Sequence, residues 1–161
     1  MIDSERNGYG TELSDILQTF EGQTAIDQQK LSSRFWDMFI VDALIGNWDR
    51  HNGNWGFLYN TITDGLELAP VYDCGSCLYP QADEEIMKAV LDDPKEQDFR
   101  IFEIPLSAIM ENGKKIKYFD FISSLKNTDC NRALQRIVPK IDMSRICSMV
   151  KETPFDYSGV L

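Results

Sequence analysis

The sequence has little positive charge and a single histidine. Its 161 residues include 16 Lys and Arg against 26 Asp and Glu, which gives a formal net charge of −10. Nucleic acids and anionic membranes are bound through clustered cations that neutralise phosphate groups. The charge balance therefore argues against a nucleic-acid or membrane partner, although it leaves room for a small basic pocket.

Long apolar runs are also missing. No stretch of about 18 apolar residues occurs, so no membrane-spanning helix is expected. The polar start MIDSERNGYG lacks the apolar core of a secretion signal. A cytoplasmic location is the default expectation. The 43% share of hydrophobic residues still supports a core, and the length fits one domain or one lobe of a larger protein.

The four cysteines lack the partners that redox or zinc chemistry needs. Cys74 and Cys77 form a CGSC pair, while Cys130 and Cys147 lie far apart with no histidine beside them. A zinc site needs two more ligands near the pair, and a thioredoxin-like site needs a βαβ context. We therefore expect reduced, structural thiols.

Hydrophobic periodicity predicts a mainly helical chain with one small β-hairpin. The helix over 27–45 is apolar nearly all round, which indicates burial, and Gly46 and Asn47 are suitable stops. The hairpin strands are 55–59 and 66–71, around an Asp64-Gly65 turn. Residues 1–10 are expected to be disordered and 99–104 extended. Further helices are predicted over 11–20, 82–91, 105–110, 118–125, 129–138 and 142–151.

The polar loop GNWDRHNGNWG, over 46–56, is the strongest indication of chemistry. It places Asp49 five residues before Asn54, and the hairpin then leads to Asp73 in APVYDCG. Phosphoryl-transfer kinases use this order: an Asp that orients the acceptor hydroxyl, an Asn for Mg²⁺ and a later Asp for the metal. Mg²⁺ prefers one or two carboxylates together with phosphate oxygens and water. Asn54 and Asp73 at the two ends of a hairpin fit that preference.

Other residues of the loop have less specific interpretations. His51 is favoured as a contact of ligand phosphates because of its place in the loop. Arg50 has two evenly matched partners, a nearby acid or a phosphate. Asp42 lies in a very apolar helix and is expected to face the loop and cap its amides. Packing is the favoured role of the tryptophans, Trp36, Trp48 and Trp55.

The strings FIVDALIGNWDRHNGNWGFL and LELAPVYDCGSCLYP resemble the C-terminal lobe of the HipA-like serine/threonine kinases, and most closely their CtkA-like branch. The resemblance implies the C-lobe of a protein-kinase-like α+β fold with ATP and Mg²⁺ as cofactors. It implies that Asp49 is catalytic, that His51 and Asn54 contact nucleotide phosphates or Mg²⁺, and that Tyr72 and Asp73 face nucleotide and metal. The family phosphorylates Ser or Thr of proteins, and several members are toxins paired with an antitoxin.

The chain departs from that family in what precedes the catalytic helix. The family's N-lobe carries a phosphate-binding glycine-rich loop and a nucleotide-pairing Lys. Only about 30 residues stand before the helix here, without either pattern. We therefore expect residues 1–161 to be a C-lobe without its N-lobe and inactive alone. Two alternatives stay open: a non-catalytic module that docks a partner, such as a separate N-lobe or an antitoxin, and a metal-dependent phosphoester hydrolase.

Overall fold

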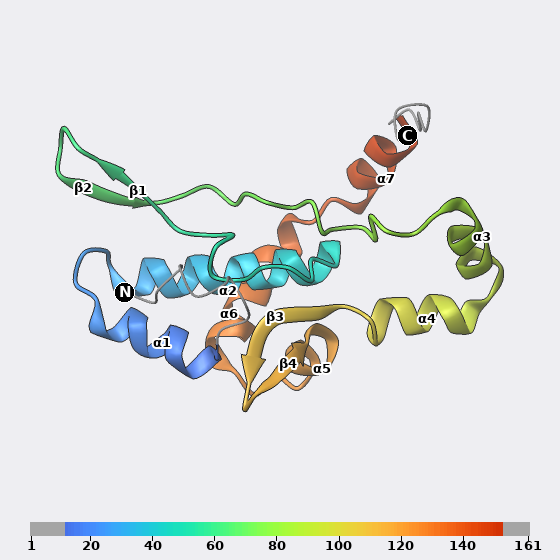
Figure 1. The fold of residues 1–161 in the computed structure, drawn as a ribbon, viewed down its shortest axis with the longest axis horizontal. Helices are drawn as coiled ribbons and strands as arrows, with labels where there is room; N and C mark the ends of the chain where they lie inside the picture. The colour runs from blue at the N-terminus through green and yellow to red at the C-terminus, as the bar shows by residue number, and fades with distance from the viewer. Residues whose placement is uncertain (1–11, 153–161) are drawn as a thin grey trace.

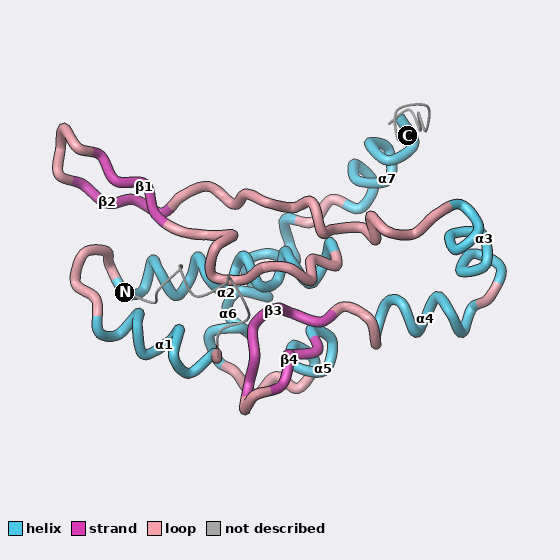
Figure 2. Tube along the Cα trace, in the orientation of Figure 1, coloured by secondary structure: helices cyan, strands magenta, loops and turns pink. Residues whose placement is uncertain are grey.

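The computed structural model describes residues 12–152, and this part of the chain is mainly helical with two antiparallel β-hairpins (Figures 1 and 2). The mainly α architecture with a small hairpin is thereby confirmed. The disorder expected for 1–10 concerns residues outside the described range. The elements are α1 (Leu13–Gly22), α2 (Gln28–Ile45), β1 (Phe57–Asn60), β2 (Gly65–Leu68), α3 (Glu84–Asp92), α4 (Pro94–Phe102), β3 (Leu106–Glu111), β4 (Lys114–Lys117), α5 (Tyr118–Ser123), α6 (Thr128–Ile137), the 3₁₀ turn η1 (Val138–Lys140) and α7 (Met143–Glu152).

Helix α2 is the centre of the fold. It begins at Asp27, whose side chain accepts a hydrogen bond from the backbone N–H of Lys30, and it ends at Gly46 in the left-handed conformation. Its apolar residues pack against α1, α5 and α6, as their all-round distribution predicted. Arg136 of α6 also pairs with Asp37 of α2 at 2.7 Å. The core residues are Leu13, Ile16, Phe20, Leu31, Phe35, Trp36, Met38, Phe39, Ile40, Ile109, Ile116, Tyr118, Cys130 and Ala133.

The second hairpin, β3–β4, corrects the sequence prediction of a helix over 105–110. Asn112 and Gly113 both have positive φ, at 55° and 74°, which is the backbone of a tight primed hairpin turn. Ala108 and Ile109 are buried in β3, and Ile116 is buried in β4. Tertiary burial of these apolar residues therefore outweighs the helical spacing that the local sequence suggested.

The extended segment expected over 99–104 is also wrong, because most of it belongs to α4. Asp93 caps that helix by accepting from the N–H of Lys95, and Pro94 occupies the first turn. Helices α3 and α4 have no buried residue, and they extend from the core at the end opposite the β1–β2 hairpin (Figure 1). In the described part of the chain, no helix is both long and apolar enough to cross a bilayer.

Candidate active site

The loop after α2 is held by the helix that precedes it. The left-handed Gly46 (φ 65°) turns the chain, and the N–H of Asn47 donates to the carbonyl of Asp42 at 2.9 Å. The buried Asn47 side chain donates a second hydrogen bond to the Asp42 carboxylate, also at 2.9 Å. The hydroxyl of Tyr118, the first residue of α5, donates to the Asn47 carbonyl at 2.8 Å. Asn47, at the start of the loop, is therefore held through its backbone N–H, its side chain and its backbone carbonyl.

Of the two partners expected for Arg50, the structure shows the nearby acid, which is Asp42. Its Nε and Nη2 donate to the two carboxylate oxygens of Asp42 at 2.9 and 3.0 Å, and both side chains are 1% exposed. Burial alone would lower the pKa of Arg50, but the hydrogen bonds and charge of Asp42 outweigh it and raise the pKa. Asp42 binds the loop through this guanidinium and through Asn47, which confirms that it faces the loop.

The same guanidinium joins two segments that are far apart in sequence. Its Nη1 donates to the carbonyl of Asn54 at 2.6 Å and to the carbonyl of Tyr72. Two acceptors on one nitrogen lie within about two hydrogen-bond lengths of each other, roughly 5–6 Å. The hydroxyl of Tyr72 also donates to the carbonyl of Gly53 at 3.1 Å. The loop and the segment that contains Asp73 therefore lie side by side.

Direct contacts bring Asp49, His51 and Asn54 together. Nδ2 of the 7% exposed Asn54 donates to the carbonyl of Asp49 at 2.8 Å. Nδ1 of His51 accepts from the N–H of Gly53 at 3.0 Å, and its Nε2 lies 3.9 Å from a carboxylate oxygen of Asp49. The carboxylate of Asp49 remains partly exposed, where an incoming group can reach it. Asp73 follows the Tyr72 carbonyl that Arg50 binds, and its φ of 54° is left-handed.

The donor set fits a cation that is shared with a ligand. Because Nδ2 of Asn54 is fixed by the backbone, the amide oxygen Oδ1 is the atom left to bind a cation. Within residues 12–152, no three His, Cys, Asp or Glu side chains gather as a metal site. A hydrolase with a two-metal clamp normally needs several carboxylates. One neutral oxygen and one carboxylate instead match Mg²⁺ that takes its other ligands from phosphate and water.

Asn52 is a residue of the loop that the sequence analysis did not single out. Its side-chain oxygen is buried and has no hydrogen-bond partner in the described structure. An unpaired buried acceptor costs about 1–3 kcal/mol, so such atoms are concentrated where a ligand or water completes the site. The burial of this oxygen depends on the path of the loop. In the sequence, the only signal for Asn52 is its position between His51 and Asn54.

The cysteines are free thiols, as expected. Cys74 is exposed, and its Sγ accepts from Nη2 of Arg50 at 3.6 Å. Cys77 is partly buried, and burial together with the neighbouring Cys74 raises the pKa of its thiol to about 11. The CGSC segment therefore lies against the same arginine that organises the loop.

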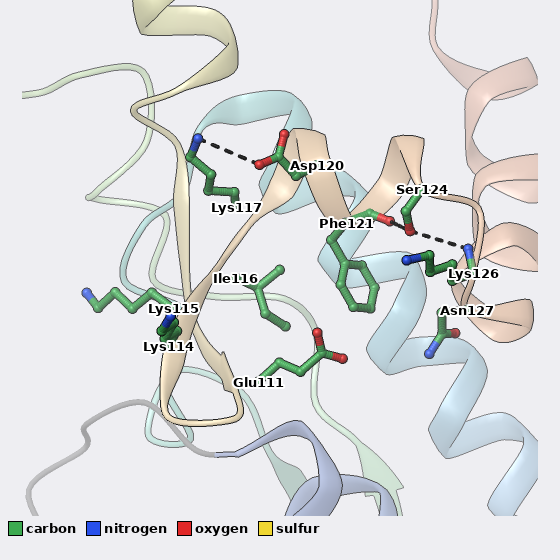
Figure 3. Close-up of a pocket in the computed structure, with 10 residues that line it drawn as sticks. All are labelled: Glu111, Lys114, Lys115, Ile116, Lys117, Asp120, Phe121, Ser124, Lys126 and Asn127. Carbon is green, nitrogen blue, oxygen red and sulfur yellow. Dashed lines mark hydrogen bonds and ion pairs between the residues drawn. The ribbon is translucent and has the colours of Figure 1, made fainter.

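A cavity of about 530 Å³ lies elsewhere, beside the β3–β4 hairpin and α5 (Figure 3). Lys117 pairs with Asp120 at its rim, and Ile116 and Phe121 form its apolar wall. None of the site residues predicted from the sequence lines this cavity.

The candidate site is the loop after α2. It is fixed to α2 and is joined through Arg50 to the segment that follows the β1–β2 hairpin. The chain belongs to the family of the HipA-like C-terminal domain, whose model matches residues 2–148. The serine/threonine-protein kinase CtkA of Helicobacter pylori strain J99 is 47% identical over 156 residues, which is 96% of this chain and 48% of that protein.

A solved structure is equally similar. The crystal structure of a Helicobacter pylori proinflammatory kinase CtkA matches with a TM-score of 0.89 and 46% identity, covering 97% of this chain and 57% of that chain. The chain thus spans about half the length of the relatives it matches. These likenesses confirm the resemblance that the sequence strings indicated.

Proposed function

We propose that the chain is the C-terminal lobe of a serine/threonine kinase that transfers the γ-phosphoryl group of ATP to a Ser or Thr of a protein. The kinase name of the 47% identical relative supports the activity. The observation that carries the proposal is the single Nη1 atom of Arg50, which binds the carbonyls of Asn54 and Tyr72. That bridge joins the backbone of Asn54 to the residue directly before the acidic Asp73, which supports a site shared by Asn54 and Asp73.

In this proposal Asp49 is the catalytic residue. Its partly exposed carboxylate accepts a hydrogen bond from the hydroxyl of the substrate Ser or Thr and takes its proton. The hydroxyl oxygen bonds to the γ-phosphorus while the bond from that phosphorus to the β–γ bridging oxygen breaks, and ADP leaves. The side chain of Asn54 donates to the carbonyl of Asp49, so the proposed metal ligand also holds the backbone of the proposed base.

The remaining residues bind the nucleotide. Oδ1 of Asn54 and the carboxylate of Asp73 would hold Mg²⁺, which would neutralise the charge of the phosphates. His51, whose Nδ1 is occupied by the N–H of Gly53, presents Nε2 to a phosphate oxygen. The side chain of Tyr72, fixed by its hydroxyl at Gly53, faces the nucleotide.

We propose that the 161 residues act as one lobe and are inactive alone. The relatives are about twice as long, so about half of their length lies in a part that this chain does not match. Binding energy comes from summed contacts, and we therefore expect the isolated chain to bind Mg·ATP weakly. An N-lobe, supplied by other residues, is the partner that would complete the clamp for a protein substrate.

The direct test is titration of the chain with ATP in the presence and absence of Mg²⁺. Asp73→Asn should weaken Mg·ATP binding by at least about tenfold, because it removes the charged metal ligand. Asp64→Asn is a matched control, since Asp64 also has a left-handed backbone (φ 52°) but lies in the β1–β2 turn. Equal weakening by both variants, or sub-micromolar binding by the isolated chain, would contradict the proposal.

The alternative function, a non-catalytic module that docks a partner protein, has one observation in its favour. The β1–β2 hairpin exposes large apolar side chains, with Ile62 at 93% exposure and Phe57, Leu58 and Tyr59 around half exposed. An antitoxin or a separate N-lobe could cover them. Mixing the chain with a separately expressed N-lobe and labelled ATP distinguishes the two functions. Phosphorylation that Asp49→Asn abolishes supports catalysis, whereas binding without transfer supports the module.

A further inference from the structure

We propose that Cys74 and Cys77 form a reversible dithiol–disulfide pair, a redox modification site that lies directly beside Asp73. The two cysteines occupy one turn: the N–H of Cys77 donates to the carbonyl of Cys74 at 3.2 Å. Turns of this kind bring their end Cα atoms within about 7 Å, and disulfides need about 4.4–6.8 Å. The turn can therefore close without unfolding the segment.

The surroundings give the two sulfurs different roles. Cys74 is exposed, so an external disulfide can reach it, whereas Cys77 is partly buried behind it. The guanidinium of Arg50 lies 3.6 Å from the sulfur of Cys74 and is itself fixed by Asp42. Cys74 is therefore the sulfur that reacts first, and Cys77 is the resolving thiol.

The remaining thiols have no such arrangement. Cys130 is buried in α6, and Cys147 is exposed on α7. An exposed cysteine without a neighbouring thiol can form a mixed disulfide but cannot resolve it within the chain. Cys147 therefore serves as the comparison for Cys74, because it is an exposed thiol without a second cysteine in its own turn.

The reaction requires a low-molecular-weight disulfide such as oxidised glutathione. The sulfur of Cys74 attacks one glutathione sulfur, the glutathione disulfide bond breaks, and the first glutathione leaves as a thiol. The sulfur of Cys77 then attacks the sulfur of Cys74, the mixed bond breaks, and the second glutathione leaves as a thiol. The protein gives up two electrons and two protons, and the oxidant is reduced to two glutathione molecules.

Closing this turn affects the residue that precedes it. Asp73 has a left-handed backbone, and the carbonyl before it is held by Arg50. A covalent ring that begins at Cys74 restricts the rotation that Asp73 needs in order to adjust to a bound cation. Oxidation should therefore weaken Mg·ATP binding by about tenfold, which is in the usual range of coupling between two sites. This consequence rests on the function proposed above.

The test equilibrates the 161-residue chain in glutathione buffers of increasing oxidised fraction, quenches with acid, alkylates and maps the peptides by mass spectrometry. Wild type should show an internal Cys74–Cys77 disulfide that reduced glutathione fully reverses, while Cys147 carries only a glutathione adduct. Cys77→Ser should retain the adduct on Cys74, and Cys147→Ser should leave the internal disulfide unchanged. A stable glutathione adduct on Cys74 of the wild type, at the level seen on Cys147, would overturn the pair.

Titration of the oxidised and reduced wild type with Mg·ATP tests the consequence. The expected result is about tenfold weaker binding by the oxidised chain. Equal affinity of the two forms would overturn the coupling to Asp73. If neither form bound Mg·ATP although the disulfide formed, the proposed kinase function would fail while the redox pair would stand.

Discussion

The guanidinium of Arg50 forms two hydrogen bonds with the carboxylate of Asp42, and both side chains are almost fully buried. This ion pair connects the centre of α2 with the loop that follows it. Because Arg50 also binds the carbonyls of Asn54 and Tyr72, its loss disturbs both segments of the candidate active site. The pair is thus a structural requirement for the site, without itself touching a ligand.

Arg50→Met should therefore destabilise the protein strongly. The substitution leaves Asp42 buried without its cation, which typically costs about 3–5 kcal/mol. Urea unfolding followed by circular dichroism gives the change in the free energy of unfolding. Arg132→Met is the control, since Arg132 pairs with Asp129 on the surface and such pairs contribute about 0–1 kcal/mol. Similar losses in the two variants would contradict the role given to the buried pair.

Tyr118→Phe should lower stability by about 1–3 kcal/mol, because it leaves the carbonyl of Asn47 without its buried donor. Tyr59→Phe is matched to it, since the hydroxyl of Tyr59 bonds to Asp64 at an exposed position. That control should change the free energy of unfolding by less than about 0.5 kcal/mol. If urea unfolding gives Tyr118→Phe the same free energy of unfolding as the wild type, the hydrogen bond from Tyr118 does not stabilise the loop.

Gly46→Ala should cost roughly 1–2 kcal/mol, because an alanine at φ 65° is strained even though a Cβ there meets no atom within 4 Å. Gly22→Ala provides the comparison. A Cβ at Gly22 also meets nothing, but its φ is not in the left-handed range, so alanine should be neutral or slightly stabilising. Thermal unfolding of the two variants side by side separates backbone strain from packing. Equal melting temperatures would contradict the strained cap.

Stability should fall in alkaline solution. Burial raises the pKa of the Cys130 thiol from 9.0 to about 11, and it also raises the pKa of Tyr118. Above pH 9 the unfolded thiol loses its proton while the folded one keeps it, so the unfolded state gains stability as the pH rises. The free energy of unfolding should be steady below pH 9 and decrease toward pH 11. Cys130→Ala should make that decrease shallower; a stability that rises over this range would contradict the assignment.

The sequence was informative where local signals and burial agree. Helix α2 and its stop at Gly46 were predicted because a stretch that is apolar nearly all round and ends in glycine has few other structures. The β1–β2 hairpin followed from the Asp64-Gly65 turn. Helix α4 was not predicted although its signal is present in the sequence: Asp93 is a cap and Pro94 is a first-turn residue.

Other features depend on tertiary contacts that no local pattern encodes. The β3–β4 hairpin forms because Ile109 and Ile116 reach the core, and Lys114 and Lys115 beside them hide the strand alternation. In the site, Asp42 and Arg50 were both recognised as notable residues. Their pairing could not be decided from sequence, since a phosphate was an equally suitable partner for Arg50. The unpaired oxygen of Asn52 depends on the path of the loop.

The central claim is that Asn54 and Asp73 jointly hold a divalent cation with a nucleotide. Paramagnetic Mn²⁺ in place of Mg²⁺, added with ATP to the isotopically labelled chain, tests it most directly by nuclear magnetic resonance. The account predicts selective broadening of the amide signals around Asn54 and Asp73, which Asp73→Asn abolishes and Asp64→Asn does not. Broadening centred on the acidic first turn of α3, at Glu84 and Glu85, with the loop signals unchanged would contradict it.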